Sequence, residues 1–292
     1  MVAYLTAILS GGLGNQLFQI AAAYALALDL GVDFKISKRN FFGAGAQGRG
    51  PENYSTTVFS ELGFLDNQIH TDDTVISERS WAYESIRGLV KAVIRDHGYA
   101  CIRGYYQSDL YFRHHKEAIR RLFTPLGSHG YTTWILQYKP IIADMYRELL
   151  EDNSYCFIGI RRGDYLTNYN RTIHNPCGET YYRSAMLRMP SERYYIASDD
   201  IEWCRQTFLG PQFRFFELGL EEDETQLALM TLFRRYIISN SSFYWWGSYL
   251  SRYEDSMVIA PDKWIFGPAV QPHQYYSIYR DDMTVLARPI EY

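Results

Sequence analysis

Short apolar runs alternate along the chain with longer mixed segments, and several of these runs end abruptly in glycine or polar residues. The first run, residues 3–9, is followed by the turn Gly11–Gln16 and then by an apolar segment over residues 17–28. This order predicts a strand, a glycine turn and a buried helix. Further strands are predicted at residues 102–106, 155–160, 194–198 and 236–238. Strands that alternate with helical segments favour an α/β fold over an all-α or all-β one.

The length of 292 residues suffices for one large domain or two smaller ones, and a break in the middle of the pattern favours two. Pro125–Ser128 breaks the pattern, a helix is predicted over about residues 135–150, and a polar stretch then leads into the next strand. We therefore expect a first domain over residues 1–150 and a second over residues 151–292. The glycine-rich stretch at residues 38–57 is predicted to be a long surface loop.

Composition narrows the functional classes. With 47% hydrophobic residues, 21% charged residues and a net charge of −4, the chain is typical of globular proteins and does not favour a general nucleic-acid binder. The first residues lead directly into a strand without a secretory leader, and no apolar run reaches membrane-spanning length, so a cytoplasmic location is expected. Four widely spaced cysteines indicate neither a zinc site nor a disulfide framework. The only close histidine pair, His114 and His115, is expected on a solvated helix face rather than at a metal.

Two motifs about 150 residues apart point to a split site for a diphosphate. Glycines in the turn Gly11–Gln16 let backbone N–H groups approach an anion at the start of a helix. Arg161 and Arg162 follow directly after a predicted strand, at the strand end where open α/β sheets bind ligands. Because a guanidinium fork matches phosphate oxygens, this second position suits a diphosphate as well.

Two more strand ends carry polar groups suited to a nucleotide. Asp199 and Asp200 follow one strand, and Asn240, Ser241 and Ser242 follow another. A carboxylate there can accept hydrogen bonds from a base or a ribose, and serines at a helix start can donate to phosphate. The same residues have simpler interpretations, since the aspartates can be solvated turn residues or metal ligands and the arginines can form structural ion pairs.

Together these motifs closely resemble those of the α-1,2-fucosyltransferases, glycosyltransferase family 11. The resemblance runs from about residue 8 to about residue 266. It rests on the segments Gly11–Gln19, Arg161–Tyr165, Tyr181–Met186, Ser198–Asp200, Asn240–Gly247 and Pro261–Phe266. One departure is Gly159, because the family pattern commonly has a histidine two residues before the first arginine. This difference puts a contact to the donor in doubt.

The resemblance implies an α/β enzyme of the GT-B type, with two Rossmann-like domains that face a cleft. The first domain would be the acceptor side and the second would bind the nucleotide sugar, with a last helix that packs back on the first domain. The implied reaction moves L-fucose from GDP-β-L-fucose to the 2-hydroxyl of a galactose, with inversion and without a metal or other cofactor. The implied acceptor is a galactose-terminated oligosaccharide or a lipid-linked glycan, used in the cytoplasm or at the membrane periphery.

Roles carried over from the family are assigned residue by residue. Arg161 would stabilise the β-phosphate, Asp164 would orient the arginines or the acceptor, and Asn15 would approach the β-phosphate or the fucose. The remaining donor-binding residues would be Gly12, Gly14, Arg162, Asp199, Asp200, Asn240, Ser241 and Ser242. Acceptor contacts are assigned to His174, Tyr165 and Trp245, although packing is the favoured interpretation of the tryptophan. The sequence does not identify a general base.

Two other classes of function stay open at this point. A dinucleotide-dependent oxidoreductase would explain the glycine turn, but the turn lacks the third glycine of the G-x-G-x-x-G motif and the arginine pair has no role in it. A non-catalytic nucleotide- or carbohydrate-binding module derived from the transferase fold is suggested only by Gly159.

Overall fold

The computed structural model describes residues 2–37, 41–42, 49–65, 72–124, 140–152, 154–218, 222–266 and 270–288. These residues divide into two compact units, one over residues 1–131 with 276–278 and one over residues 132–275 with 279–292. The division therefore falls about twenty residues before the expected boundary at 150, because the helix that precedes the arginine strand belongs to the second unit. No described helix is long and apolar enough to span a bilayer.

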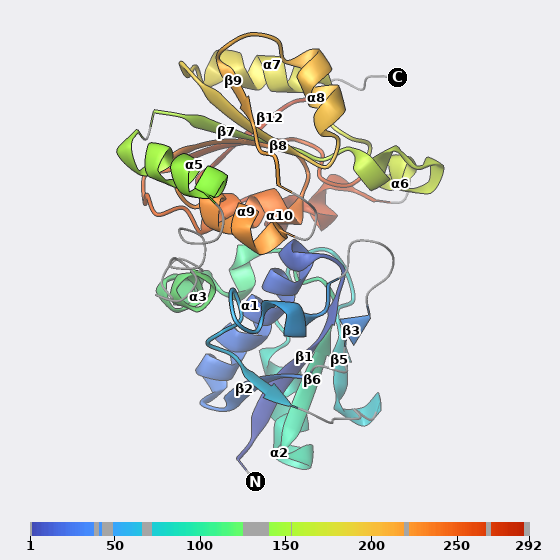
Figure 1. The fold of residues 1–292 in the computed structure, drawn as a ribbon. Coiled ribbons are helices and arrows are strands. Elements are labelled where there is room, and N and C mark those ends of the chain that lie inside the picture. The colour runs from blue at the N-terminus through green and yellow to red at the C-terminus, as the bar shows by residue number, and fades with distance from the viewer. Residues whose placement is uncertain are drawn as a thin grey trace. The chain divides into compact units, whose positions relative to one another are not determined.

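Unit 1 is built on a parallel sheet (Figure 1). Its strands follow the order β4-β2-β1-β6-β5, and β3 pairs with the end of β1. Their bounds are β1 Tyr4–Ser10, β2 Asp33–Ser37, β3 Phe41–Phe42, β4 Gly63–Leu65, β5 Val75–Ser77 and β6 Tyr99–Arg103. The helices are α1 Leu13–Leu30, α2 Arg87–His97 and α3 Lys116–Phe123, with 3-10 turns η1 Pro51–Tyr54, η2 Asp72–Thr74, η3 Asp109–Tyr111, η4 Arg113–His115 and η8 Tyr276–Ile278.

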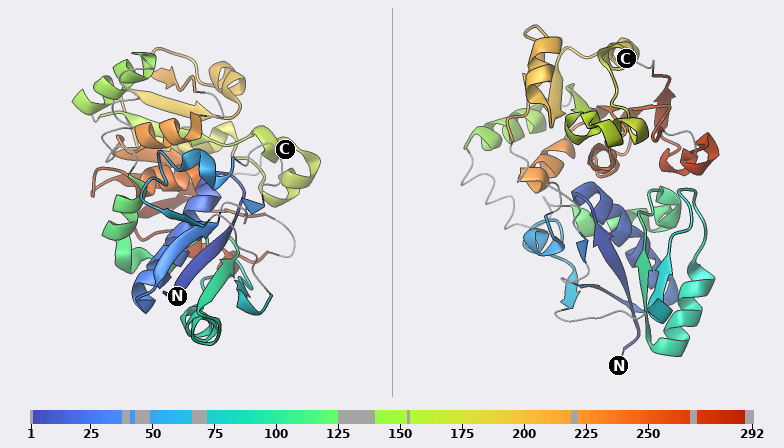
Figure 2. Two further views of the ribbon diagram at one scale, coloured as in Figure 1. Left: turned by 60° about the horizontal axis from the view of Figure 1, so that its bottom comes forward. Right: turned by 90° about the vertical axis from the view of Figure 1, so that its right-hand side faces the viewer.

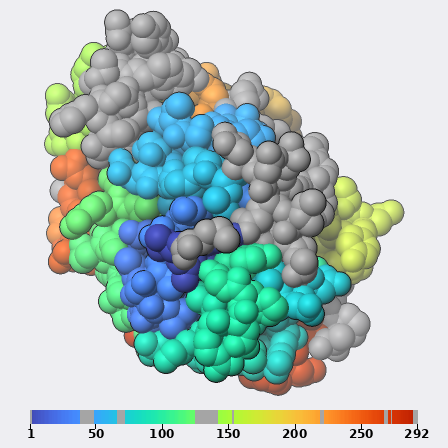
Figure 3. All heavy atoms as spheres, turned by 90° about the horizontal axis from the view of Figure 1, so that it is seen from below, coloured from blue at the N-terminus to red at the C-terminus, as the bar shows by residue number. Residues whose placement is uncertain are grey.

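The first helix forms because its sequence is apolar on all sides. Thirteen of the 18 residues of α1 are buried, including Leu17, Phe18 and Ile20, which is typical of a helix enclosed by the fold. It ends at Gly31, whose positive φ of 65° closes the helix in the left-handed conformation. By contrast, α2 buries only Val90 and lies at the surface that faces the viewer in Figure 3.

Unit 2 also contains a parallel sheet, in the order β12-β11-β10-β7-β8-β9. Its strands are β7 Cys156–Ile160, β8 Tyr194–Ser198, β9 Phe213–Phe215, β10 Arg235–Ile238, β11 Met257–Pro261 and β12 Met283–Leu286. Its helices are α5 Pro140–Glu151, α6 Asn168–Ile173, α7 Glu179–Arg188, α8 Ile201–Thr207, α9 Asp223–Met230 and α10 Ser242–Tyr249, with 3-10 turns η5 Gly163–Leu166 and η7 Pro272–Gln274. Counted along the chain, this is the strand order of a doubly wound nucleotide-binding sheet.

Helices cover both faces of this second sheet (Figures 1 and 2). All five residues of β7 are buried, as expected for a parallel strand between two helical layers. Ile158 and Ile160 belong to a core cluster with residues of α7 and α8, whereas Phe157 packs against Tyr244 of α10. The alternation of faces along β7 thus decides which helix each side chain meets.

Several predicted elements differ from the structure. The expected surface loop at residues 38–57 lies partly outside the described residues, but its end forms η1 and Tyr54 there is fully buried, so the loop assignment is wrong at that end. The packing of a last helix on the first domain stays a prediction; the last 3-10 turn of the described chain, η8, groups with unit 1, and the strand β12 follows it.

Candidate donor-binding site

In unit 2, the predicted donor residues gather where the strand order reverses. The first strand of this sheet along the chain, β7, lies between β8 and β10, so successive strands are added first on one side of β7 and later on the other. Open sheets bind ligands at such a switch point, beyond the carboxyl ends of the strands. Arg161 follows β7, Asp199 follows β8 and Ser239 follows β10, which places all three at this edge of the sheet.

The Arg161 guanidinium is held by two carboxylates. Its Nη2 lies 2.8 Å from Asp164 Oδ1 and its Nη1 lies 3.1 Å from Asp199 Oδ2. Burial works to lower the pKa of Arg161, but the neighbouring Asp199, Tyr165 and Asp164 outweigh it and raise that pKa. The side chain is only 19% exposed, so one planar group is held in a fixed orientation at the sheet edge.

Arg162 is fixed by a second set of contacts. Its backbone N–H donates to Asp199 Oδ1 at 2.8 Å, and its Nε donates to Asp200 Oδ2 at 3.1 Å. Its guanidinium lies over the indole ring of Trp203, 3.9 Å from the ring centroid. Trp203 was not among the predicted residues, and only its position in the first turn of the helix after Asp200 could have indicated it.

Asp199 and Asp200 therefore connect two neighbouring strand ends. Besides binding Arg162, Asp200 uses Oδ1 to accept from the backbone N–H of Trp203 at 3.3 Å, which caps α8. A Cβ at Gly163 would lie 2.5 Å from Asp199 Oδ2, so a larger side chain there would displace this carboxylate. In the structure both aspartates position arginines, while the contact of Asp200 with a nucleoside stays a prediction.

The segment after β10 combines a buried amide with a helix start. Asn240 is 1% exposed, and its Nδ2 donates to the carbonyl oxygens of His174 and Trp264 at 2.8 and 3.0 Å. This amide therefore connects two loops inside the fold, and the contact of Asn240 with the donor stays a prediction. Ser241 is the N-cap of α10, without a side-chain capping bond, and the first turn holds no acidic residue. The start of α10 with Ser242 thus remains suited to an anion.

The predicted acceptor residues separate into a half-buried pair and a core residue. His174 stacks on Tyr165 with ring centroids 4.3 Å apart, and the Tyr165 hydroxyl donates to the carbonyl oxygen of Asn240 at 3.0 Å. Burial lowers the pKa of His174, which favours the neutral imidazole. Trp245 is fully buried and stacks on Tyr249. It cannot offer a ring face to a sugar, so its assignment to the acceptor is wrong.

In unit 1, the glycine turn lies at the equivalent place. The strand β1 lies between β2 and β6, and the turn that follows it starts with Gly11 at a φ of 75°. Gly12 is the N-cap of α1, while Gly14 is already buried within the first turn of that helix. Asn15 Oδ1 accepts a hydrogen bond from Gln107 Nε2 at 2.8 Å, so a residue of the loop after β6 fixes the asparagine side chain.

Two buried glutamines hold this turn in shape. Gln16 donates through Nε2 to the carbonyl oxygens of Gly11 and Arg49 at 3.1 and 2.8 Å. Gln19 accepts from the backbone N–H of Ser10 at 3.0 Å and donates to its hydroxyl at 3.1 Å. These contacts explain why amides follow the glycines in the sequence, although no role was predicted for them.

The departure at Gly159 has a packing reason. A Cβ at this position would lie 2.4 Å from Cγ of Tyr244, so no larger side chain fits while the tyrosine ring stays in place. The Tyr244 hydroxyl donates to the carbonyl oxygens of Ile160 and Ala197 at 3.3 and 3.2 Å. The ring therefore ties the ends of β7 and β8 together beneath the arginine pair.

Two curated proteins that are similar to the chain are glycosyltransferases. The chain is 28% identical to an α-1,2-colitosyltransferase of Escherichia coli over 88% of its length and 90% of that protein. It is 26% identical to the O-antigen biosynthesis glycosyltransferase WbnK of Escherichia coli over 89% of its length and 94% of that protein.

Solved structures with similar folds include two glycosyltransferases. The fucosyltransferase NodZ from Bradyrhizobium matches with a TM-score of 0.40 at 13% identity, covering 85% of this chain and 93% of that one. A family 9 glycosyl transferase from Veillonella parvula matches with a TM-score of 0.46 at 10% identity, covering 99% and 88%. Each of the two units contains one parallel sheet, in agreement with the two Rossmann-like domains that the family resemblance implies. The model of glycosyl transferase family 11 matches residues 66–284, and the chain therefore belongs to that family.

Proposed function

We propose that the protein is an inverting galactoside α-1,2-fucosyltransferase that uses GDP-β-L-fucose. The observation that carries the proposal is the arginine pair at the switch point of unit 2, with Arg161 held between Asp164 and Asp199. Family membership supports a glycosyl transfer reaction, and the name of one relative contains the same α-1,2 linkage.

The chemistry requires charge stabilisation at the leaving group. The bond between the fucose anomeric carbon and the β-phosphate oxygen breaks with its electron pair on GDP, and the galactose 2-hydroxyl oxygen bonds to the opposite face of that carbon. The hydroxyl proton is released. Fixed donors aimed at the β-phosphate stabilise the charge that develops on GDP, so Arg161 and the start of α10 take the part that a metal plays elsewhere.

The arginine cluster itself carries no excess of positive charge. Two guanidinium groups lie among the carboxylates of Asp164, Asp199 and Asp200. Affinity for a diphosphate must then come from directed hydrogen bonds rather than from net charge, and we assign it to the arginine forks and the N–H groups at the start of α10. The carboxylates keep the forks in place before the donor arrives.

The test is a transfer assay with product linkage analysis. The protein is incubated with GDP-fucose and a panel of galactosides, and the product is examined by NMR for an α-1,2 bond formed with release of one GDP. If the protein transfers only from a colitosyl donor, the proposed donor is wrong but the proposed glycosyl transfer reaction stands. Binding of GDP without turnover would favour the non-catalytic module, and preference for NAD would favour the oxidoreductase.

A further inference from the structure

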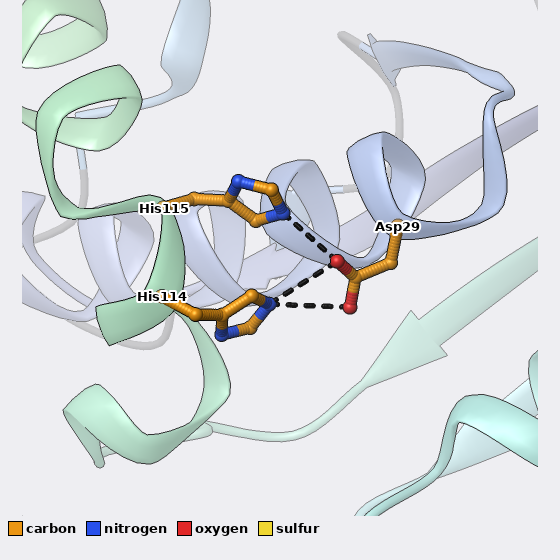
Figure 4. Close-up of side chains that lie close together, drawn as sticks. All are labelled: Asp29, His114 and His115. Carbon is orange, nitrogen blue, oxygen red and sulfur yellow. Dashed lines mark hydrogen bonds and ion pairs between the residues drawn. The ribbon is translucent and has the colours of Figure 1, made fainter.

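Three side chains of unit 1 lie close together at a distance from the glycine turn, and Figure 4 shows how they converge. Asp29 lies in the last turn of α1, and His114 and His115 form the end of η4. Nε2 of His115 lies 2.8 Å from Asp29 Oδ1, and Nε2 of His114 lies 3.2 Å from each carboxylate oxygen. The pair lies on the solvated 3-10 turn η4, as the sequence predicted, with side chains 47% and 28% exposed, but both rings turn toward Asp29.

This convergence is unusual for two residues that are adjacent in sequence. A 3-10 helix has about three residues per turn, so neighbouring side chains leave it about 120° apart. Here both rings turn toward one carboxylate, with centroids 4.5 Å apart and planes tilted by 48°. One ligand atom from each of the three residues lies within 4.8 Å of the other two.

The spacing matches a tetrahedral metal site. Zinc binds histidine nitrogen and carboxylate oxygen at about 2.0–2.2 Å, so two ligands of a tetrahedral ion lie roughly 3.3 Å apart. The nitrogen–oxygen distances of 2.8 and 3.2 Å are within about half an ångström of that value. Metal binding requires each ring proton on Nδ1 and the Nε2 lone pair on the ion, and the two ligand nitrogens, which lie within 4.8 Å of each other, must come to about the same spacing.

Access and ligand type narrow the choice of ion. The side chains of Asp29, His115 and His114 are 24%, 28% and 47% exposed, so water can reach the site and occupy a fourth position. Two imidazoles with one carboxylate suit zinc and similar transition metals. Magnesium and calcium prefer sets of oxygen ligands, and this cluster offers only one carboxylate.

We propose that Asp29, His114 and His115 bind one divalent transition-metal ion, zinc in the first place. The ion would tie the end of α1 to the turn that leads into α3. Asp29 follows Asn15 by 14 residues along α1, which corresponds to about 21 Å of helix. The ion therefore stabilises unit 1 and takes no part in chemistry at the glycine turn.

The test uses the full chain without a histidine tag. Calorimetric titration with zinc chloride should give one site per chain, zinc should raise the thermal midpoint, and cobalt chloride should give the visible absorption of a tetrahedral ion. Asp29→Asn, His114→Ala and His115→Ala should each weaken zinc binding by more than ~10-fold, the smallest loss expected when even a supporting group of a metal site is removed. Magnesium chloride should give no saturable binding.

His97→Ala is the matched control, because this exposed histidine ends α2 in the same unit and lies outside the cluster. Its zinc affinity should equal that of the wild type. Circular dichroism of each variant separates loss of a ligand from loss of the fold. Absence of a saturable zinc site in the wild type, or a site that keeps its affinity in all three cluster variants, would overturn the proposal.

Discussion

Replacement of Arg161 by lysine tests whether the reaction needs a guanidinium fork or only a positive charge. The arginine meets Asp164 through Nη2 at 2.8 Å and Asp199 through Nη1 at 3.1 Å. A lysine keeps the charge, but its single ammonium cannot reproduce the two divergent contacts or the planar orientation that they impose. Loss of one preorganised donor costs about 3 kcal/mol of transition-state stabilisation, which corresponds to a fall in kcat of roughly 150-fold.

Initial rates of GDP release with saturating donor and acceptor would measure this effect. Arg183→Lys is the control, because Arg183 also bonds a carboxylate, Glu179, at 2.6 Å but lies half-exposed on α7. Its rate should stay within about twofold of the wild type. A folded Arg161→Lys variant that keeps more than half of the wild-type kcat would refute the reasoning and move the role to Arg162.

Three further outcomes follow from the same contacts. Gly159→Ala should lower the thermal midpoint, because overpacking against Tyr244 costs about 1–3 kcal/mol of folding stability. Gly88→Ala is the control and should not lower it, because the space around a Cβ at Gly88 is open. Equal midpoints of the two variants would contradict the contact with Tyr244. Because the pKa of His174 is lowered by burial, the unfolded chain binds a proton more readily and stability is lost as the pH falls below about 6.5. His174→Phe should therefore reduce the fall in thermal midpoint between pH 7 and 5, and an unchanged profile would contradict this. Excess EDTA should leave transfer by the Asp29→Asn variant nearly intact, and metal-reversible loss in that variant would make Asp199 and Asp200 ligand candidates.

The strands with the clearest apolar runs were predictable from the sequence. β7 and β8 lie within their predicted runs, and β1 and β10 match theirs to within one residue at each end. Strands of a parallel sheet are buried on both faces and therefore read as continuous hydrophobic stretches. The order of strands was not predictable, since it depends on pairing between segments far apart in the chain. The boundary near residue 131 could not be read either, because the contacts of α5 with unit 2 are not local.

The sequence predicted which residues lie at the candidate site better than it predicted what each of them contacts. Arg161, Arg162, Asp199 and Asp200 were each placed at strand ends, but their mutual contacts depend on β7 and β8 being neighbours in the sheet. The error at Trp245 has the opposite cause. Tryptophan serves equally in cores and in sugar-binding surfaces, and only the packing of α10 shows that its ring is buried.

Gly159 and Tyr244 are best understood as one feature. In the family pattern a histidine commonly takes the position of Gly159, but here the Tyr244 ring fills that volume, as the 2.4 Å approach of a Cβ shows. Because its hydroxyl donates to Ile160 and Ala197, the ring fixes the two carbonyls that directly precede Arg161 and Ser198. Tyr244 is also the third residue of α10, so the same ring anchors the first turn of that helix against β7. The missing histidine is thus replaced by a packing contact that positions both the arginine and the start of α10, and we expect the change to act on donor binding through that geometry.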